Sequence, residues 1–190
     1  MKWMRDASFV SVPAISGTEK ALVTNTTLCG PTLLLEINGE HFETQTETAT
    51  PLIFLLRNTL GLTGTKLGCG LEQCRACVVL ADGESTPSCT RPAEDFAGKW
   101  IVTIEGLPRL HHEVTSRVMS AFIAEGAAQC GYCTPGMVIA LAGALLRNPD
   151  SYAADLCSAL KGHLCRCGSY AAIRRAIDRI SGETAHGRKD

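Results

Sequence analysis

From Thr32 the pattern of apolar and polar positions changes to an alternation that continues to about Thr44. Leu33, Leu35 and Ile37 would lie on one face of a strand, because successive side chains of a strand point to opposite sides of the sheet. The Asn38-Gly39 pair that follows is the strongest short signal for a tight hairpin turn. The pattern therefore predicts two paired strands in this part of the chain.

A short helix and two more strands are expected next. Pro51 opens a run of apolar residues at helical spacing that ends near Gly61. Runs rich in β-branched and other apolar residues at 78–80 and 100–104 predict strands. A hairpin, one helix and two further strands are typical of a small α+β domain with a single core.

After Pro108 the spacing of apolar residues becomes helical, and four apolar stripes each predict a short amphipathic helix. The stripes consist of Val114, Val118, Met119, Phe122 and Ile123; of Met137, Val138, Leu141 and Leu145; of Leu156, Ala159 and Leu160; and of Ile173, Ile177 and Ile180. We expect a small bundle whose core is formed by these stripes. Residues 1–31 have weak periodicity, and we interpret them as an N-terminal extension.

Composition limits the classes of function. The chain has 190 residues and a formal net charge of −1, so there is no electrostatic reason to expect a nucleic-acid partner. No apolar run is long enough for a membrane span, and no secretory signal is visible at the N-terminus. The ten cysteines therefore indicate a reducing, cytoplasmic setting, where clustered thiols bind metal more often than they form disulfides.

The first cysteine set follows the expected helix directly. Its spacing is C-x4-C-x2-C-x11-C, and the first three positions match the plant-type ferredoxin spacing for a [2Fe-2S] cluster. Gly64, Gly68 and Gly70 give the loop the backbone freedom to wrap around a cluster. A disulfide pair or a structural zinc site is the alternative reading of this loop. The set consists of Cys69, Cys74, Cys77 and Cys89.

The second cysteine set lies between the expected helices and has the spacing C-x2-C-x31-C-x-C. Thr134 and Ser169 are the expected N-caps of the helices that follow its two halves. Two helix N-termini near an anionic iron–sulfur cluster would make that cluster easier to reduce. A four-cysteine zinc site remains the alternative, although the C-x-C pair suits it poorly. The set consists of Cys130, Cys133, Cys165 and Cys167.

Three motifs together resemble those of the small [2Fe-2S] subunit of the molybdenum hydroxylases, the xanthine dehydrogenase and aldehyde oxidoreductase superfamily. They are Gly-Thr-Lys-Leu-Gly-Cys-Gly at 64–70, Gln-Cys-Gly-Tyr-Cys-Thr-Pro-Gly at 129–136 and Gly-His-Leu-Cys-Arg-Cys-Gly-Ser-Tyr at 162–170. The resemblance implies an α+β chain with a β-grasp, plant-type [2Fe-2S] ferredoxin domain at 32–107. A helical [2Fe-2S]-binding domain of four helices would follow at 108–190.

The resemblance also implies cofactors and partners. The second cluster would lie next to the molybdenum–pterin cofactor of a separate large subunit, with Gln129 and Cys167 approaching the pterin. Electrons would pass to the first cluster and then to an FAD subunit or a cytochrome. The chain would thus be an oxidoreductase subunit that transfers electrons and performs no substrate chemistry. The identity of the substrate lies outside these residues.

Two other functions fit parts of the sequence. A stand-alone ferredoxin would explain the first cysteine set but leave the helical half without a purpose. A zinc-stabilised interaction module would use the cysteines without any redox role. Iron and acid-labile sulfide analysis separates this last possibility from the other two.

Several residues depart from the family pattern or lie outside both sets. Arg75 stands where the family commonly has glycine, and a cation there should raise the potential of the first cluster unless its side chain points to solvent. Gly168-Ser169 replaces the common Thr-Gly, with little expected consequence. We expect Cys157 to be a small buried hydrophobe, and we assign no chemistry to Cys29. The five histidines form no ligand pattern.

Overall fold

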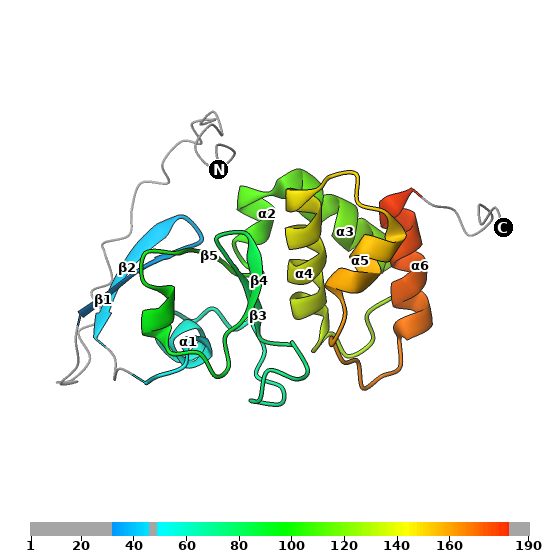
Figure 1. The fold of residues 1–190 in the computed structure, drawn as a ribbon. Helices are drawn as coiled ribbons and strands as arrows, with labels where there is room; N and C mark the ends of the chain where they lie inside the picture. Colours follow the sequence, from blue (N-terminus) through cyan, green and yellow to red (C-terminus); the bar gives the residue numbers. More distant parts are fainter. Residues whose placement is uncertain (1–31, 46–48, 183–190) are drawn as a thin grey trace.

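A five-stranded mixed sheet forms one side of the molecule (Figure 1). The strand order is β2-β1-β5-β3-β4; β1 runs parallel to β5, and the other neighbours are antiparallel. This computed structural model describes residues 32–45 and 49–182. The strands are β1 (Thr32–Ile37), β2 (Glu40–Gln45), β3 (Val78–Ala81), β4 (Glu84–Pro87) and β5 (Trp100–Val102).

The predicted hairpin and strands are confirmed, and one strand was missed. Asn38 and Gly39 both have left-handed backbone conformations, with φ of 56° and 77°, which a tight turn between β1 and β2 requires. The missed strand is β4, whose residues Glu-Ser-Thr-Pro have no apolar alternation. It forms because Asp82 and Gly83 turn the chain back onto β3, where it pairs in register.

The helix predicted after Pro51 is present but changes type. It begins as α1 (Leu52–Phe54) and continues as the π-helical segment η1 (Leu55–Thr59). Gly61, with φ of 68°, follows its end. Leu52, Leu55 and Leu56 pack on one face of the sheet against Leu35, Ile37, Val79 and Ile101, together with Phe96 of the 3-10 helix η2 (Ala93–Phe96).

Helices cover the opposite face of the sheet. They are α2 (Leu107–Leu110), α3 (His112–Ala124), α4 (Thr134–Arg147), α5 (Ala153–Ala159) and α6 (Tyr170–Ser181). Helix α4 lies between the sheet and the other helices, and every residue at 136–145 is buried (Figure 1). A helix that is apolar on all sides is expected in such a central position. Its contacts with Val78, Leu80 and Val102 of the sheet join the two halves in one hydrophobic cluster.

The four apolar stripes form core as predicted, with one correction. Met119 and Ile123 of α3 are not core residues: their exposed fractions are 43% and 77%. Val118 and Phe122 lie on the side of α3 that packs against α4 and α6, whereas no described element covers the side that carries Met119 and Ile123. The short helix α2 was not predicted.

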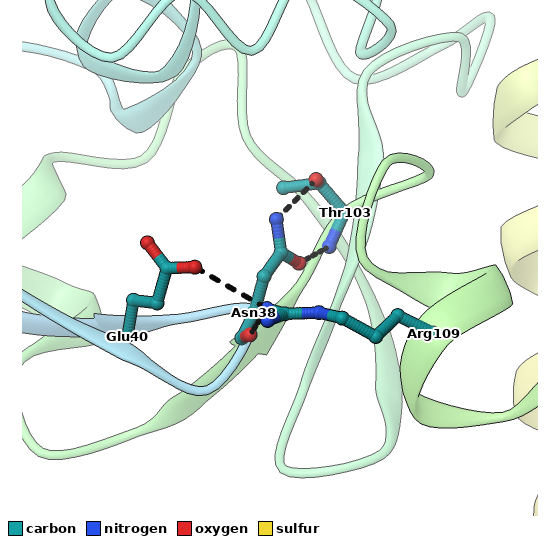
Figure 2. Close-up of polar contacts among 4 residues, drawn as sticks. All are labelled: Asn38, Glu40, Thr103 and Arg109. Carbon is teal, nitrogen blue, oxygen red and sulfur yellow. Dashed lines mark hydrogen bonds and ion pairs between the residues drawn. The ribbon is translucent and has the colours of Figure 1, made fainter. Parts of the chain in front are cut away.

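A buried polar contact ties the β1–β2 turn to the start of the helical half (Figure 2). The Asn38 side chain donates to Thr103 Oγ1 over 3.0 Å, and its Oδ1 accepts from the Thr103 backbone N–H over 2.9 Å. Arg109 of α2 donates to the Asn38 carbonyl and pairs with Glu40 over 3.4 Å. Gly106 is required beside this contact, because a Cβ there would overlap the Asn38 side chain.

The structure does not test two of the predictions about how the chain is divided. The boundary between domains at residues 107 and 108 stays a prediction, and the N-terminal extension at 1–31 lies outside the described residues. Within the described part of the chain, no helix is both long and apolar enough to cross a membrane.

Candidate metal centres

The first cysteine loop runs without regular secondary structure from the end of η1 to the start of β3. Its backbone N–H groups point at sulfur. Those of Leu71, Gln73 and Cys74 donate to Cys69 Sγ over 3.2–3.3 Å, and that of Cys69 donates to Cys74 Sγ over 3.2 Å. The Cys69 thiol loses some hydration, which opposes its ionisation, but these hydrogen bonds outweigh that loss and lower the pKa of the thiol to about 7. The loop is therefore arranged to hold thiolate.

Cys77 lies at the end of this loop, and Cys89 lies beside it in the segment that follows β4. Both are buried, next to Ile53 and Leu67. Burial, together with the neighbouring Cys89 thiol, raises the pKa of Cys77 to about 11. A thiol in such a place ionises readily only when the positive charge of a bound metal compensates for the lost hydration of the thiolate.

Close packing fixes the shape of the loop. A Cβ at Gly68 would lie 2.5 Å from Cys74 Sγ, so only glycine leaves this sulfur in its place. Gly70, Glu72 and Arg75 all have left-handed φ values, of 67°, 59° and 56°. Two non-glycine residues in the left-handed region within one short loop are unfavourable for the backbone alone. They indicate that the positions of the sulfur atoms determine the conformation of this loop.

The second cysteine set comes together from two separate segments. Cys133 neighbours Cys165, and Cys130 neighbours Cys167. Burial and the adjacent Cys165 thiol raise the pKa of Cys133 to about 12. For Cys130, a backbone hydrogen bond from Tyr132 and a side-chain bond with Cys167 lower the pKa of the thiol. Cys130 and Cys167 are exposed, whereas Cys165 is buried.

Both halves of the second set adjoin helix N-termini, as the sequence predicts. Cys133 itself occupies the cap position of α4, so the expectation that Thr134 would be the N-cap is wrong by one residue. Ser169 does occupy the cap position of α6, but its hydroxyl makes no capping bond. This buried hydroxyl has no hydrogen-bond partner of ordinary geometry among the described residues, and it lies beside Cys165, whose pKa it helps to lower.

Direct contacts connect the two cysteine loops. The Leu164 backbone N–H donates to the Cys74 carbonyl over 3.2 Å. The Tyr132 hydroxyl donates to the Leu67 carbonyl over 2.7 Å. On α4, a Cβ at Gly136 would lie 2.5 Å from the Arg75 carbonyl oxygen, so glycine permits the helix to approach the first loop. These contacts join residues that are far apart in the sequence, so no local sequence pattern predicts them.

The thiols lie in pairs that suit a binuclear cluster. Within residues 32–45 and 49–182, no three His, Cys, Asp or Glu side chains are placed to hold one metal ion. The eight thiols instead lie in neighbouring pairs, two pairs in each set. A [2Fe-2S] cluster takes four thiolates, two on each of its irons, which is the arrangement that such pairs supply. The N–H groups directed at Cys69 and the unpartnered Ser169 hydroxyl are donors suited to its sulfurs.

The remaining candidate residues are placed as follows. Gln129 is exposed beside Cys130. Cys157 packs against the helical core as predicted, but it is only half-buried and accepts a hydrogen bond from Arg174 over 3.3 Å. Cys29 lies outside the described residues. His163, which the sequence did not single out, is buried next to the first loop, where burial and the Arg75 charge lower its pKa to about 4.

Two family models match the chain, one for each cysteine set. Residues 35–99 match the 2Fe-2S iron-sulfur cluster binding domain, and residues 103–178 match the [2Fe-2S] binding domain. The chain therefore carries two [2Fe-2S]-binding domains, and its cofactors are two [2Fe-2S] clusters.

Curated relatives cover most of the chain. A nicotinate dehydrogenase subunit of Pseudomonas putida is 42% identical over 150 residues, which are 79% of this chain and 94% of the relative. A probable xanthine dehydrogenase subunit of Bacillus subtilis is 40% identical over 156 residues, 82% of this chain and 88% of the relative. Both relatives are parts of larger enzymes by name, so a stand-alone ferredoxin is not favoured.

Solved structures agree with these relatives. Quinoline 2-oxidoreductase from Pseudomonas putida matches with a TM-score of 0.70 and 32% identity, over 80% of this chain and 94% of that one. Aldehyde oxidoreductase from Desulfovibrio gigas matches with a TM-score of 0.71 and 32% identity, over 80% of this chain and 17% of the much longer one. The chain belongs to the small [2Fe-2S] subunits of the molybdenum hydroxylases, the xanthine dehydrogenase and aldehyde oxidoreductase superfamily, and its function is electron transfer within a multi-subunit oxidoreductase.

Proposed function

We propose a residue-level assignment of the two clusters. One cluster is held by Cys69, Cys74, Cys77 and Cys89, and the other by Cys130, Cys133, Cys165 and Cys167. The observation that carries this assignment is the pairing of the thiols, together with the backbone N–H groups directed at Cys69 and Cys74.

Each part of the chain has a distinct role in this assignment. When bound, the clusters supply one-electron redox chemistry, which divides the two-electron oxidation of a substrate into single transfers. The first loop supplies N–H donors that stabilise negative charge on sulfur. The N-termini of α4 and α6 add a favourable field at the second set. The buried positions of Cys77, Cys89 and Cys165 keep water away from part of each site.

We further propose that the second set faces the molybdopterin of a large partner subunit. Gln129 and Cys167 would be the residues closest to the pterin, as the family resemblance implies. Their exposure supports this arrangement, because a thiol ligand at the surface of this chain needs cover from another subunit. The first cluster would then pass electrons to an FAD subunit or a cytochrome.

An apolar surface beside the second set supports the same orientation. A hollow of about 240 Å³ is lined by side chains of α3 and by residues next to the second cysteine loop. Met119 and Ile123 are its exposed apolar members, while Ala128 and Thr134 flank Gln129 and the Cys130–Cys133 segment. An exposed apolar patch continuous with a functional face is typical of a subunit interface.

The compartment is part of the proposal. All nine described cysteines are free thiols, and eight of them are assigned here to clusters. Such a set is best maintained in a reducing environment, which supports a cytoplasmic location.

Metal analysis and EPR spectroscopy of the purified complex test the assignment. We expect about four iron atoms and as much acid-labile sulfide for each copy of this chain, with two distinguishable [2Fe-2S] signals. Cys74→Ser should remove one signal, and Cys133→Ser should remove the other. A variant that lost both signals or neither would contradict the assignment, and zinc without iron would contradict any redox function.

Cys157→Ser is the matched control. Cys157 is a described cysteine outside both sets, and its contact is with Arg174. Its replacement should leave the iron content and both signals unchanged.

A further inference from the structure

Arg75 occupies an unusual position between the two cysteine loops. Its φ is 56°, a left-handed conformation that glycine would adopt without strain. Its side chain is half-buried, yet its guanidinium forms no ion pair or hydrogen bond with any residue in the described ranges. Both features are unfavourable for an isolated chain, so a compensating interaction is expected.

The side chain crosses from the first loop to the helical half. A Cβ at Gly162 would lie 3.1 Å from Arg75 Nε and 3.6 Å from its Cδ. Gly162, with φ of 88°, therefore leaves room for the arginine three residues before the ligand Cys165. On the other side, Arg75 directly follows Cys74 in the first loop. The guanidinium thus lies where the two cysteine sets approach each other.

No neighbouring acid neutralises this charge. Glu72 is the carboxylate nearest in the loop, but it binds the Thr90 hydroxyl and pairs with Arg91 over 3.6 Å. The imidazole of His163, buried beside Arg75, carries no negative charge. A hollow of about 570 Å³ is lined by Arg75, Glu72 and Lys161. Lys161 is exposed to solvent and carries a positive charge. The one carboxylate that lines this hollow, that of Glu72, is thus engaged by other residues, and no carboxylate is paired with Arg75 among the described residues.

We propose that the two anionic clusters are the counter-charge of Arg75, and that Arg75 raises their midpoint potentials, that of the first cluster most. This inference rests on the proposed cluster assignment. Each one-electron reduction adds one negative charge to a bound cluster, and a nearby cation stabilises that charge. Adjacency to the ligand Cys74 makes the effect greater at the first cluster. Arg75 thereby increases the driving force for electron transfer from the second cluster to the first.

Redox titration of the purified complex, followed by EPR, tests this role. Arg75→Gln removes the charge and keeps a side chain of similar length, and Arg75→Lys keeps the charge. In the glutamine variant we expect lower midpoint potentials, with the larger shift at the EPR signal that Cys74→Ser removes. In the lysine variant we expect potentials close to those of the wild type. The shift should be the same from about pH 6.5 to about pH 9, because guanidinium does not titrate there.

Lys161→Gln is the matched control, since it removes an equal but solvent-exposed charge from the same hollow. It should shift the potentials less than Arg75→Gln, because water screens its charge. An unchanged or higher potential in Arg75→Gln overturns the inference, as does an equal shift in both variants. These outcomes are distinct from failure of the cluster assignment, in which the wild-type complex itself would lack two [2Fe-2S] signals.

Discussion

Gly68 shows how far the first centre depends on a single residue without a side chain. The nearest atom to a Cβ at this position would be Cys74 Sγ, at 2.5 Å. In a chain without iron, the Cys74 side chain can rotate away from a new methyl group. Once Cys74 is bound to iron it cannot, so the conflict arises only when the cluster is present.

Gly68→Ala should therefore reduce cluster content more than stability. We expect about two iron atoms per chain instead of about four, and loss of the EPR signal that Cys74→Ser also removes. Gly70→Ala is the control. Gly70 has φ of 67° and no atom within 4 Å of the position that a methyl group would take, so alanine there meets only backbone strain, about 1 kcal/mol. Equal iron loss in both variants would contradict this reasoning.

At this scale the sequence indicates the proposed ligands but not the residues that surround them. Cysteine spacing along the chain predicts both sets, and the structure brings the thiols of each set together in pairs. The hydrogen bond from Tyr132 to Leu67 joins residues 65 positions apart, and no local pattern encodes it. The same holds for the empty space that Gly162 leaves for Arg75.

At the scale of elements, α3 combines a buried side and an unpaired apolar side. Val118 and Phe122 face the core, whereas Ile123 is 77% exposed. Periodicity identified the helix correctly but could not separate core positions from positions that another subunit covers, because both are apolar. Strand β4 is the opposite case: it has no pattern of its own and depends on pairing with β3.

Ile123→Glu should weaken association with the large subunit. A charge in an apolar interface loses hydration without gaining a partner, so the cost should be about 2 kcal/mol or more, roughly a thirtyfold loss of affinity. Co-purification, followed by measurement of the dissociation constant, checks this expectation. Leu34→Glu is the control, because Leu34 is 64% exposed on β1, in the other half of the molecule. A similar loss with Leu34→Glu, or none with Ile123→Glu, would argue against the proposed face.

At the scale of the whole molecule, the hydrophobic clusters and the metal-binding loops are largely separate. The two large clusters contain sheet and helix residues, and only Cys165 among the proposed ligands belongs to their buried set. The cysteine loops have little regular structure. The elements should therefore survive loss of the clusters, while the loops should lose their order.

Removal of iron with a chelator under reducing conditions tests this separation. We expect little change in far-UV circular dichroism, because α3, α4 and α6 keep their core. Trypsin should gain access to the loops, with new cleavage detected by mass spectrometry. The expected sites are Lys66, Arg75, Lys161 and Arg166. Loss of helical signal on chelation would instead mean that metal binding and folding of the helices are coupled.

The contacts between the loops have a kinetic consequence. The backbones of Leu164 and Cys74 are hydrogen-bonded to each other across the two halves of the molecule. Helix α4 is buried between the sheet and the other helices. Such an interface leaves no hinge about which one half could swing against the other. The step between the two centres should therefore show no dependence on solvent viscosity. Any sensitivity of turnover to added glycerol would have to come from substrate entry, product release or the encounter with the final acceptor.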